Sequence, residues 1–466
     1  MTSEPALIQA RTRGTVVLAV LAVRDAEWYL ALAARPEWPW QRTILLCTNE
    51  AAIAVARKAG REFLSVFTAE DALPKDLDPA RLHAEYGAPP EALSTAHEET
   101  NNGLTRDQAQ RKFWRRFLAY RNLLEPLGTI DVVQELGGFA TNLALHAWCR
   151  WRNQHELVIE PAPFPGRAVF SYRNVFVELP TIENPPADAV ARGTAWRDAF
   201  LSRPAVLMPE KDSLFFRPAG IGKLLSFDFQ RRAWRKVMRR FFFRQREEFS
   251  ALSVQVREQA MRVVRSRALR HDYRTPPSGT TYVYYPLHVP WDVQLTFRSP
   301  AHFDQFALLD RLIAALPPTW CVVTKEHPAA LGSYPLGPLR RLIAGGRCFL
   351  APPQLNSLEL ARAARTVITV NSKVGFEAMC AGLPVITLGP SFYRGQGCTI
   401  DADSVEAAAA AAVAGVPGAA RDAVDRLLGR IWAASFPTEL YVQRDEAIAT
   451  SAAGIRDAAQ ALIPSV

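Results

Sequence analysis

A lysine and a histidine follow an apolar run in the second half of the chain, in the segment Lys325 to Pro328 (KEHP). The run before it, CVVT, predicts a buried strand, so both side chains are expected at the carboxyl end of that strand. There Lys325 and His327 can both donate hydrogen bonds to a phosphate group, and Pro328 stiffens the turn. The alternative is a solvated loop in which the histidine occurs by chance.

A second anion site is predicted where the β-branched run of residues 366–370 ends. Asn371 and Ser372 are good N-cap residues, and a helix is expected to start at Lys373. The first N–H groups of such a helix attract anions, and the Ser372 hydroxyl and the Lys373 charge would add to that attraction. Glu377, about one and a half turns further on, can accept hydrogen bonds from ribose hydroxyls. The alternative is an ordinary strand–helix–strand unit with a capped helix.

Other predicted strands end in side chains that can do acid–base chemistry. His288, Asp292 and Gln294 follow the strand YVYYPLH, Glu135 ends DVVQE, and Glu160 ends ELVIE. A carboxylate in such a place acts as a general base, or as a nucleophile toward an electrophilic sugar carbon. Glu135, Glu160 and Asp292 are therefore the catalytic candidates. Structural roles are the alternative for each of them.

Several well-known motifs are absent from the sequence. It has no G-x-G-x-x-G, H-E-x-x-H or G-x-S-x-G, and GIGK at residues 220–223 lacks the spacing and the Ser/Thr of a P-loop. No cluster has metal-ligand spacing, so neither a metal nor a cofactor is expected. The six cysteines are scattered without a C-x-x-C pair, which indicates buried thiols in a reducing compartment.

The elements that must position these residues alternate between short apolar runs and helical patterns. Continuous apolar strands between helices are typical of parallel sheets that are covered on both faces. The predicted strands are residues 15–23, 42–48, 62–68, 131–138 and 156–163 in the first half, and 282–288, 320–328, 365–372 and 384–389 in the second. The fold class is therefore α/β, with two doubly wound Rossmann-type domains, and ligands are expected outside the carboxyl ends of the strands.

Changes in composition predict three units along the chain. Residues 1–275 form a first α/β domain, with an insertion rich in arginine and aromatic residues at about 181–275. Pro-Pro-Ser-Gly within residues 271–281 indicates a linker. Residues 276–430 form a second α/β domain, and residues 431–466 form a tail of helices that can cross back to the first domain.

The net charge of +9 favours anionic partners such as nucleotides or phospholipid head groups. Half of residues 231–246 (RRAWRKVMRRFFFRQR) are basic, which is typical of a cationic amphipathic surface suited to anionic lipid. Residues 111–121 have a similar composition. The alternative for both segments is a solvated helix face with its aromatic residues in the core. Nucleic acid is not expected, because no recognition module accompanies them.

No apolar stretch of the sequence is long enough to span a bilayer, which takes about 20 residues. The run at residues 15–23 lies behind Arg11 and Arg13 and is similar to a signal peptide. Arg24 and Asp25 follow it at once, however, and no small-x-small cleavage site is present. A buried first strand is therefore the prediction for this run.

From Thr281 to Thr399 the sequence resembles the bacterial capsule-polysaccharide synthesis family, which includes the KpsC- and KpsS-like β-Kdo transferases. The likeness is carried, in matching order, by YYPLHVPWDVQL, KEHP, VNSKVGFEAMCAGLPVITLG and SFYRGQG. The chain departs from the family pattern at His288, where Gln is common, and at Lys373, where a small hydroxyl residue is common. Glu160 is followed by Pro-Ala-Pro-Phe and not by the family's Gly-aromatic pattern.

The resemblance implies a GT-B glycosyltransferase, with two domains around a cleft and a nucleotide-sugar donor held mainly by the second domain. The implied donor is CMP-Kdo, and the implied product is a Kdo-containing glycolipid or capsule linker. By position in the family motifs, the donor-binding residues would be Lys325, His327, Pro328, Asn371, Ser372, Lys373, Gly375 and Glu377.

The expected function is therefore glycosyl transfer in capsular or surface polysaccharide biosynthesis, at the cytoplasmic face of the inner membrane. Expected partners are a nucleotide-sugar donor, a glycolipid or saccharide acceptor, an anionic membrane surface and other capsule synthesis or export proteins. The alternatives are a transferase that uses another nucleotide sugar, a non-catalytic assembly or export partner with the same fold, and a nucleotide-sugar epimerase.

Overall fold

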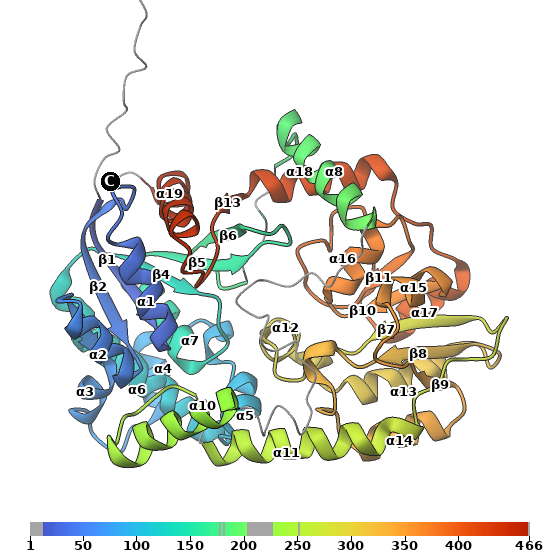
Figure 1. Cartoon of the computed structure of the whole chain (residues 1–466), viewed down its shortest axis with the longest axis horizontal. Coiled ribbons are helices and arrows are strands. Elements are labelled where there is room, and N and C mark those ends of the chain that lie inside the picture. Colours follow the sequence, from blue (N-terminus) through green and yellow to red (C-terminus); the bar gives the residue numbers. More distant parts are fainter. Residues whose placement is uncertain (1–12, 177–178, 180–181, 203–226, 250–251, 465–466) are drawn as a thin grey trace, which may run out of the picture.

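The computed structural model describes residues 13–464 apart from residues 177–178, 180–181, 203–226 and 250–251. This part of the chain is organised by two sheets, each covered by helices (Figure 1). The predicted fold class, two doubly wound α/β domains of the GT-B type, is confirmed by this arrangement. The cleft between the domains stays a prediction.

The first sheet has seven strands in the order β13-β6-β5-β4-β1-β2-β3. Their bounds are β1 Arg13–Val20, β2 Trp40–Cys47, β3 Phe63–Ser65, β4 Asp131–Glu135, β5 His155–Pro161, β6 Arg167–Tyr172 and β13 Ser435–Pro437. The strands from β1 to β5 are parallel, whereas β6 is antiparallel to both of its neighbours.

Helices cover both faces of the first sheet and bury the tryptophans of this domain. One face packs against α6 and α7 with Trp114 and Trp148, and the other against α1, α2 and α19 with Trp28. The helices around this sheet are α1 Val23–Leu32, α2 Glu50–Lys58, α3 Val66–Asp71, α4 Pro79–Tyr86, α5 Ala96–Asn102, α6 Arg106–Leu124, α7 Ala140–Trp151 and α19 Asp445–Leu462.

The second sheet has six parallel strands in the order β12-β11-β10-β7-β8-β9. Their bounds are β7 Tyr282–Pro286, β8 Cys321–Lys325, β9 Cys348–Leu350, β10 Thr366–Thr369, β11 Val385–Thr387 and β12 Ile400–Asp401. The helices of this domain are α12 Val293–Thr296, α13 Gln305–Ala315, α14 Leu336–Ala344, α15 Ser357–Ala363, α16 Lys373–Cys380, α17 Val405–Ala414 and α18 Arg421–Ala433.

The chain crosses between the domains more often than the predicted boundaries suggest. After α18 it returns to the first domain, where β13 joins the sheet and α19 packs against α1. The helix α8 (Ala187–Ser202) precedes the second sheet in sequence but packs on α18. Glycines permit this close crossing, because a Cβ atom at Gly193 would lie 2.8 Å from the Cβ of Leu428.

Four strands have no counterpart among the predicted ones: β6, β9, β12 and β13. Three of them are only two or three residues long, too short for a hydrophobic pattern. The first strand also ends at Val20, earlier than predicted, since the Asp25 carboxylate accepts hydrogen bonds from the N–H groups of Leu21 and Ala22 and starts α1.

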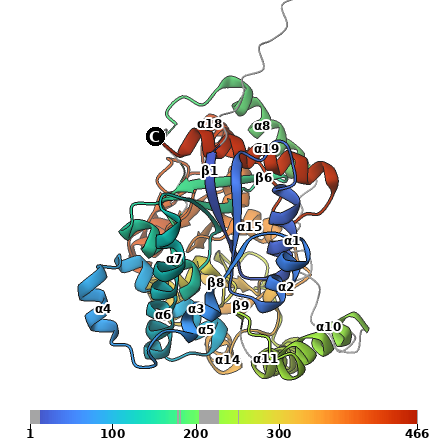
Figure 2. The same cartoon turned by 90° about the vertical axis from the view of Figure 1, so that its left-hand side faces the viewer.

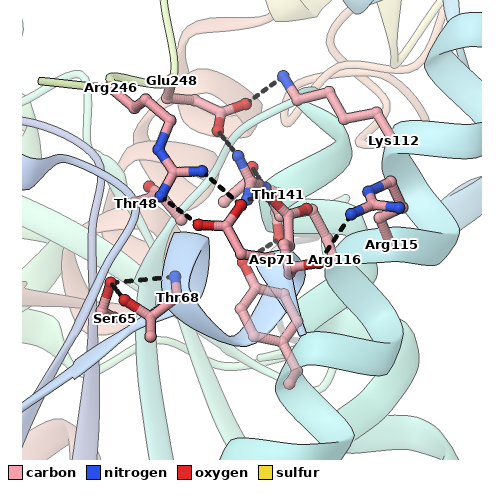
Figure 3. Close-up of polar contacts among 12 residues, drawn as sticks. Thr48, Ser65, Thr68, Asp71, Lys112, Arg115, Arg116, Thr141, Arg246 and Glu248 are labelled. Atoms are coloured by element: carbon pink, nitrogen blue, oxygen red, sulfur yellow. Dashed lines mark hydrogen bonds and ion pairs between the residues drawn. The ribbon is translucent and has the colours of Figure 1, made fainter. Parts of the chain in front are cut away.

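The insertion contains α10 (Phe227–Val237), a π-helical turn η4 (Met238–Phe242) and α11 (Leu252–Ala268). Between η4 and α11, ion pairs attach the chain to the first domain (Figure 3). Arg246 binds both oxygens of Asp71 at 2.7 and 2.8 Å. Glu248 is buried and pairs with Lys112 and, at 3.1 Å, with Arg116. We call these contacts of Arg246 and Glu248 the clamp.

Further along, α11 contacts the second domain. Arg262 donates hydrogen bonds to the carbonyl oxygens of Ala329 (2.6 Å) and Leu331 (3.3 Å), and Arg265 donates to that of Ser333 (3.3 Å). These acceptors lie in the loop that follows the KEHP turn. The insertion therefore connects the clamp on the first domain to a loop at the edge of the second sheet.

We expect Glu248→Gln to lower the free energy of unfolding by about 3 kcal/mol at pH 7, because it removes the buried carboxylate that Lys112 and Arg116 share and leaves them only Glu98 and Glu70. Burial raises the pKa of Glu248, but the charges of Lys112 and Arg116 outweigh it and hold this pKa below the ordinary 4.5. The stabilisation is thus present above pH 4.5 and is lost as the pH falls below it.

Urea denaturation followed by tryptophan fluorescence measures the loss. The control is Glu62→Gln, which breaks the exposed pair with Arg42 and should cost less than about 1 kcal/mol. Equal stability of the wild type and Glu248→Gln at pH 7 would contradict the assignment of the clamp.

Candidate functional site

The carboxyl ends of three neighbouring strands bring His288 and two of the predicted donor-binding residues to one edge of the second sheet. His288 follows β7, His327 follows β8, and Ser372 follows β10, and β7 lies between the other two strands. Because the strands are parallel, the segments after them meet at the same edge. Pro328 is the first residue of a short 3₁₀ turn that follows His327.

His327 is a neutral hydrogen-bond donor in this setting. Its Nδ1 accepts a hydrogen bond from the N–H of Ala329 at 3.1 Å, which leaves the ring proton on Nε2. Burial, together with the positive charges of Lys373 and Lys325, lowers the pKa of His327 to about 4. The imidazole is therefore uncharged at neutral pH.

Lys325 is buried and points toward the start of α15. Its Nζ donates hydrogen bonds to the Leu355 carbonyl at 2.5 Å and to the Ser357 hydroxyl at 3.2 Å. Burial lowers the pKa of Lys325, and the negative charge of Glu377 opposes that shift. Glu377 on α16 is itself only 8% exposed. Lys325 and Glu377 therefore act on each other electrostatically at the edge of the sheet.

Lys373 is exposed and carries a charge that acts on two loops. It lowers the pKa of His327 after β8. Burial raises the pKa of Asp292 after β7, and the Gln294 N–H and the charge of Lys373 oppose that rise. Asp292 caps α12, since its carboxylate accepts the N–H of Gln294 at 2.9 Å. The charge of Lys373 therefore acts on both the loop after β7 and the loop after β8.

The start of α16 is fixed as the sequence predicts. Ser372 is the N-cap and accepts the N–H of Gly375 at 3.4 Å. Tyr393 donates its hydroxyl hydrogen to the Ser372 carbonyl at 2.7 Å. A Cβ atom at Gly375 would lie 2.6 Å from the Tyr393 oxygen, so only glycine allows this packing. Gly375 therefore supports the loop from behind.

Asn371 and His288 connect this edge to α12. The Asn371 side-chain amide donates to the Gln294 carbonyl at 2.9 Å and to the Ser299 hydroxyl at 3.1 Å. The Asn371 N–H donates to Nε2 of His288 at 3.3 Å. Nδ1 of His288 and Oδ1 of Asn371 are buried and have no hydrogen-bond partner among the described residues.

The first domain reaches the same segment through Glu160. Arg298, just after α12, binds both carboxylate oxygens of Glu160 at 3.0 and 2.6 Å, and Gln294 donates to one of them at 3.3 Å. Arg298 also donates to the Phe176 carbonyl at 2.6 Å. The carboxyl edges of both sheets therefore meet at α12, which lies between the domains in Figure 1.

Glu135 lies at the end of β4 in a different group of side chains. It accepts the phenolic hydrogen of Tyr441, and its charge acts on Asp25 at the start of α1. Burial, together with the charge of Glu135, raises the pKa of Asp25 to about 6 against the opposing charge of Arg24. Two carboxyl groups and a phenol thus meet at the carboxyl edge of the first sheet.

Glu135 and Glu160 project from opposite faces of the first sheet. Val133, two residues before Glu135, belongs to the core under α1 and α19, and Val158, two residues before Glu160, belongs to the core under α6 and α7. Side chains two residues apart in a strand share a face. The two carboxylates therefore share an edge but not a face.

Asp25, Arg298 and Tyr441 are site residues that the sequence patterns do not reveal. Asp25 carries a usable signal, an acid in the first turn of a helix that follows a parallel strand. Arg298 and Tyr441 carry none, because their partners lie 138 and 306 positions away in the chain. Tyr441 also has a left-handed backbone, with φ of 63°.

Within the described residues, no His, Cys, Asp or Glu side chains gather in threes to hold a metal ion. All six cysteines are buried free thiols, and burial raises the pKa of each of them. None of the described helices could cross a bilayer.

Residues 238–422 match the family model described as "Capsule polysaccharide biosynthesis protein", which confirms the resemblance predicted from the four motifs. Protein FixF of Sinorhizobium fredii is 35% identical over 139 residues, which are 28% of this chain and 32% of FixF. The capsule polysaccharide modification protein LipA of Neisseria meningitidis serogroup B is 27% identical over 130 residues, 28% of this chain and 18% of LipA. The matched region spans about a third of FixF and less than a fifth of LipA.

Two solved structures are among those similar to this chain. The β-Kdo 2,7 transferase KpsC of Thermosulfurimonas dismutans has a TM-score of 0.33 at 17% identity, over 71% of this chain and 89% of that one. The UDP-GlcNAc 2-epimerase of Neisseria meningitidis has a TM-score of 0.27 at 11% identity, over 96% of this chain and all of that one (100%).

We expect His288→Gln to make stability less sensitive to acid. Burial, together with His327, which is charged only below its own pKa of about 4, lowers the pKa of His288 from an ordinary 6.5 to about 3. Below pH 6.5 the unfolded chain binds a proton that the folded chain does not, so stability falls as the pH falls from 6.5 toward 3. Glutamine keeps an acceptor for the Asn371 N–H and removes this titration.

Unfolding free energies at pH 7 and pH 5 test this prediction. The difference between the two should shrink by on the order of 1 kcal/mol in His288→Gln. The exposed His271→Gln is the control and should behave as the wild type. A full wild-type pH difference in His288→Gln would contradict the prediction.

Proposed function

We propose that this chain, whose residues 238–422 match the capsule polysaccharide biosynthesis family model, is a glycosyltransferase that uses a nucleotide-sugar donor. One observation carries the proposal. The carboxyl edges of two doubly wound sheets meet at α12, with His327, Lys373 and the start of α16 on the second edge and carboxylates on the first. A donor bound on one edge and an acceptor on the other would react between them.

The donor phosphate would bind at Lys373, His327 and the start of α16. The exposed ammonium of Lys373 supplies the positive charge, and the neutral imidazole of His327 donates a hydrogen bond from Nε2 without first taking up a proton. The N–H groups at the start of α16 add a partial positive charge. Together they stabilise the negative charge that develops as the nucleotide leaves.

Glu135 is the stronger candidate for the reactive carboxylate. Both oxygens of Glu160 are already bound by Arg298, which reduces their ability to take a proton or to attack carbon. In the transfer, the bond from the anomeric carbon to the donor phosphate breaks, and a bond to an acceptor hydroxyl forms. Glu135 takes the proton of that hydroxyl, or attacks the anomeric carbon before the acceptor does.

The finer proposal is transfer of Kdo from CMP-Kdo to a glycolipid or saccharide acceptor, with no bound cofactor or metal. It is supported by the motif likeness to the family of the Kdo transferases, over residues 281–399. A transferase for another nucleotide sugar would respond to a different nucleotide. A non-catalytic assembly partner would bind none, and an epimerase would turn over a UDP-sugar without any acceptor.

Thermal shifts with CMP, UDP, GDP and ADP test the donor class. We expect CMP to raise the melting temperature and the other three nucleotides to leave it unchanged, since CMP is the nucleotide of the proposed donor. A ligand at a hundred times its Kd stabilises the native state by about 2.7 kcal/mol. Lys373→Ala should weaken CMP binding about tenfold, since it removes a charged hydrogen bond worth about 1.5 kcal/mol or more. Arg341→Ala, an exposed cation on α14, should bind as the wild type.

A response to UDP alone would overturn the Kdo proposal and keep that of a nucleotide-sugar transferase. No response to any of the four nucleotides would overturn both.

We expect Glu135→Gln to lower kcat/KM for transfer by about a thousandfold, the scale of a lost acid–base group, and to leave the CMP-induced shift intact. Glu160→Gln should lower kcat/KM less, by about tenfold, because the glutamine still accepts a hydrogen bond from Arg298, although that buried cation loses its counter-charge. Release of CMP from CMP-Kdo with a phosphoglycolipid acceptor measures both. The reverse ranking would make Glu160 the reactive carboxylate.

A further inference from the structure

Residues 111–121 and residues 231–246 have similar compositions, but their aromatic side chains differ in burial. In α6, the aromatic residues Phe113, Trp114 and Phe117 are at most 3% exposed, and the neighbouring Lys112 and Arg116 form internal ion pairs. Residues 111–121 therefore follow the alternative of a helix with its aromatic residues in the core. The other segment, in α10 and η4, leaves its aromatic residues in solvent, with exposed fractions of 77% for Phe227, 62% for Trp234, 70% for Phe242 and 66% for Phe243.

These exposed rings alternate with exposed cations. Phe227, Arg231 and Trp234 are spaced four and seven residues apart, so they form one stripe of α10. We define the aromatic–basic face by its exposed members, which are Phe227, Arg231, Trp234, Arg235, Arg239, Phe242, Phe243 and Arg244. Large exposed aromatic side chains in such a group indicate a surface that binds something.

The aromatic–basic face is firmly attached to the first domain. Directly after it, the backbone of Arg246 and Glu247 pairs with that of Asn49 and Glu50. The clamp then fixes Arg246 and Glu248 by ion pairs (Figure 3). Figure 2 shows α10 beside α11 at the lower edge of the molecule, outside both sheets. A partner that binds this face is therefore held to the first domain by these contacts.

We propose that the aromatic–basic face docks on the surface of an anionic phospholipid bilayer. Aromatic rings next to arginines on one helix stripe are the pattern of a helix that lies in the interface, with rings among the acyl chains and cations at the head groups. The face is a helix that stands out from the body, whereas single-stranded nucleic acid is bound in basic grooves with stacking platforms. Docking is independent of the proposed glycosyl transfer.

Flotation with vesicles tests the proposal on the full chain. Vesicles with about a third phosphatidylglycerol should carry the protein upward, and pure phosphatidylcholine should not. Binding should be strong at about 0.1 M salt, where the Debye length is about 10 Å, and weak at about 1 M, where it is about 3 Å. Failure to float with the anionic vesicles at low salt would overturn the proposal.

Paired variants separate the two components of the face. Arg235→Ala with Arg239→Ala should lower the partition coefficient about 25-fold, at about fivefold per cation. Trp234→Ala with Phe243→Ala should lower it about tenfold or more. Because these side chains are exposed, all variants should keep the wild-type melting temperature, which excludes misfolding as the cause.

Matched controls come from other surfaces. Arg106→Ala with Arg111→Ala removes two exposed cations of α6, and Phe303→Ala removes an exposed ring of the second domain. Both controls should float as the wild type does. An equal loss in the controls would overturn the proposal. Single-stranded RNA that binds more tightly than the vesicles, with the same dependence on Trp234 and Arg235, would also overturn it.

Discussion

The contact of Arg298 with Glu160 holds the two halves of the candidate site together. It ties the end of β5 to the segment after α12, and Asn371 ties the end of β10 to that same segment through Ser299. Arg298 is 8% exposed in its side chain and also binds the Phe176 carbonyl. Because a half-satisfied buried cation is costly, the domains stay in this register as long as Arg298 keeps its partners.

The neutral histidines and the exposed lysine at the carboxyl edge of the second sheet are suited to binding an anion. Burial keeps His288 and His327 neutral, with a pKa of about 3 for the first and about 4 for the second. Their charged forms are further disfavoured by nearby cations, among which Lys373 is exposed to solvent. A bound phosphate would reverse this balance, since its negative charge favours every cation around it. Under the proposed function, these side chains would therefore bind the donor phosphate without first having to carry several unfavourable charges.

The sequence predicts what depends on neighbours in the chain and misses what depends on distant ones. The strand, the Ser372 cap and α16 follow from a run of β-branched residues and a cap, all within a few positions, and are found as predicted. The placement of Lys325 is only half predictable, because its strand is local but its partners Leu355 and Ser357 are not. Composition alone also fails to distinguish the buried rings of α6 from the exposed rings of α10. The rings of α6 are buried because this helix packs in the core of the first domain, and that packing depends on residues distant in the sequence.

The return of the chain to its first domain explains the strained backbone at Tyr441. After β13 the chain must turn back toward α19, and Tyr441 makes that turn with φ of 63°, a conformation that costs a residue with a side chain about 1–3 kcal/mol. The ring is held against Trp28 at 5.3 Å and under Arg24 at 4.6 Å, while its hydroxyl binds Glu135. With an ordinary backbone at Tyr441, its side chain would point away from Glu135. The strained backbone therefore places the hydroxyl that binds the Glu135 carboxylate. The last segment of the chain thereby becomes part of the candidate site at the edge of the first sheet.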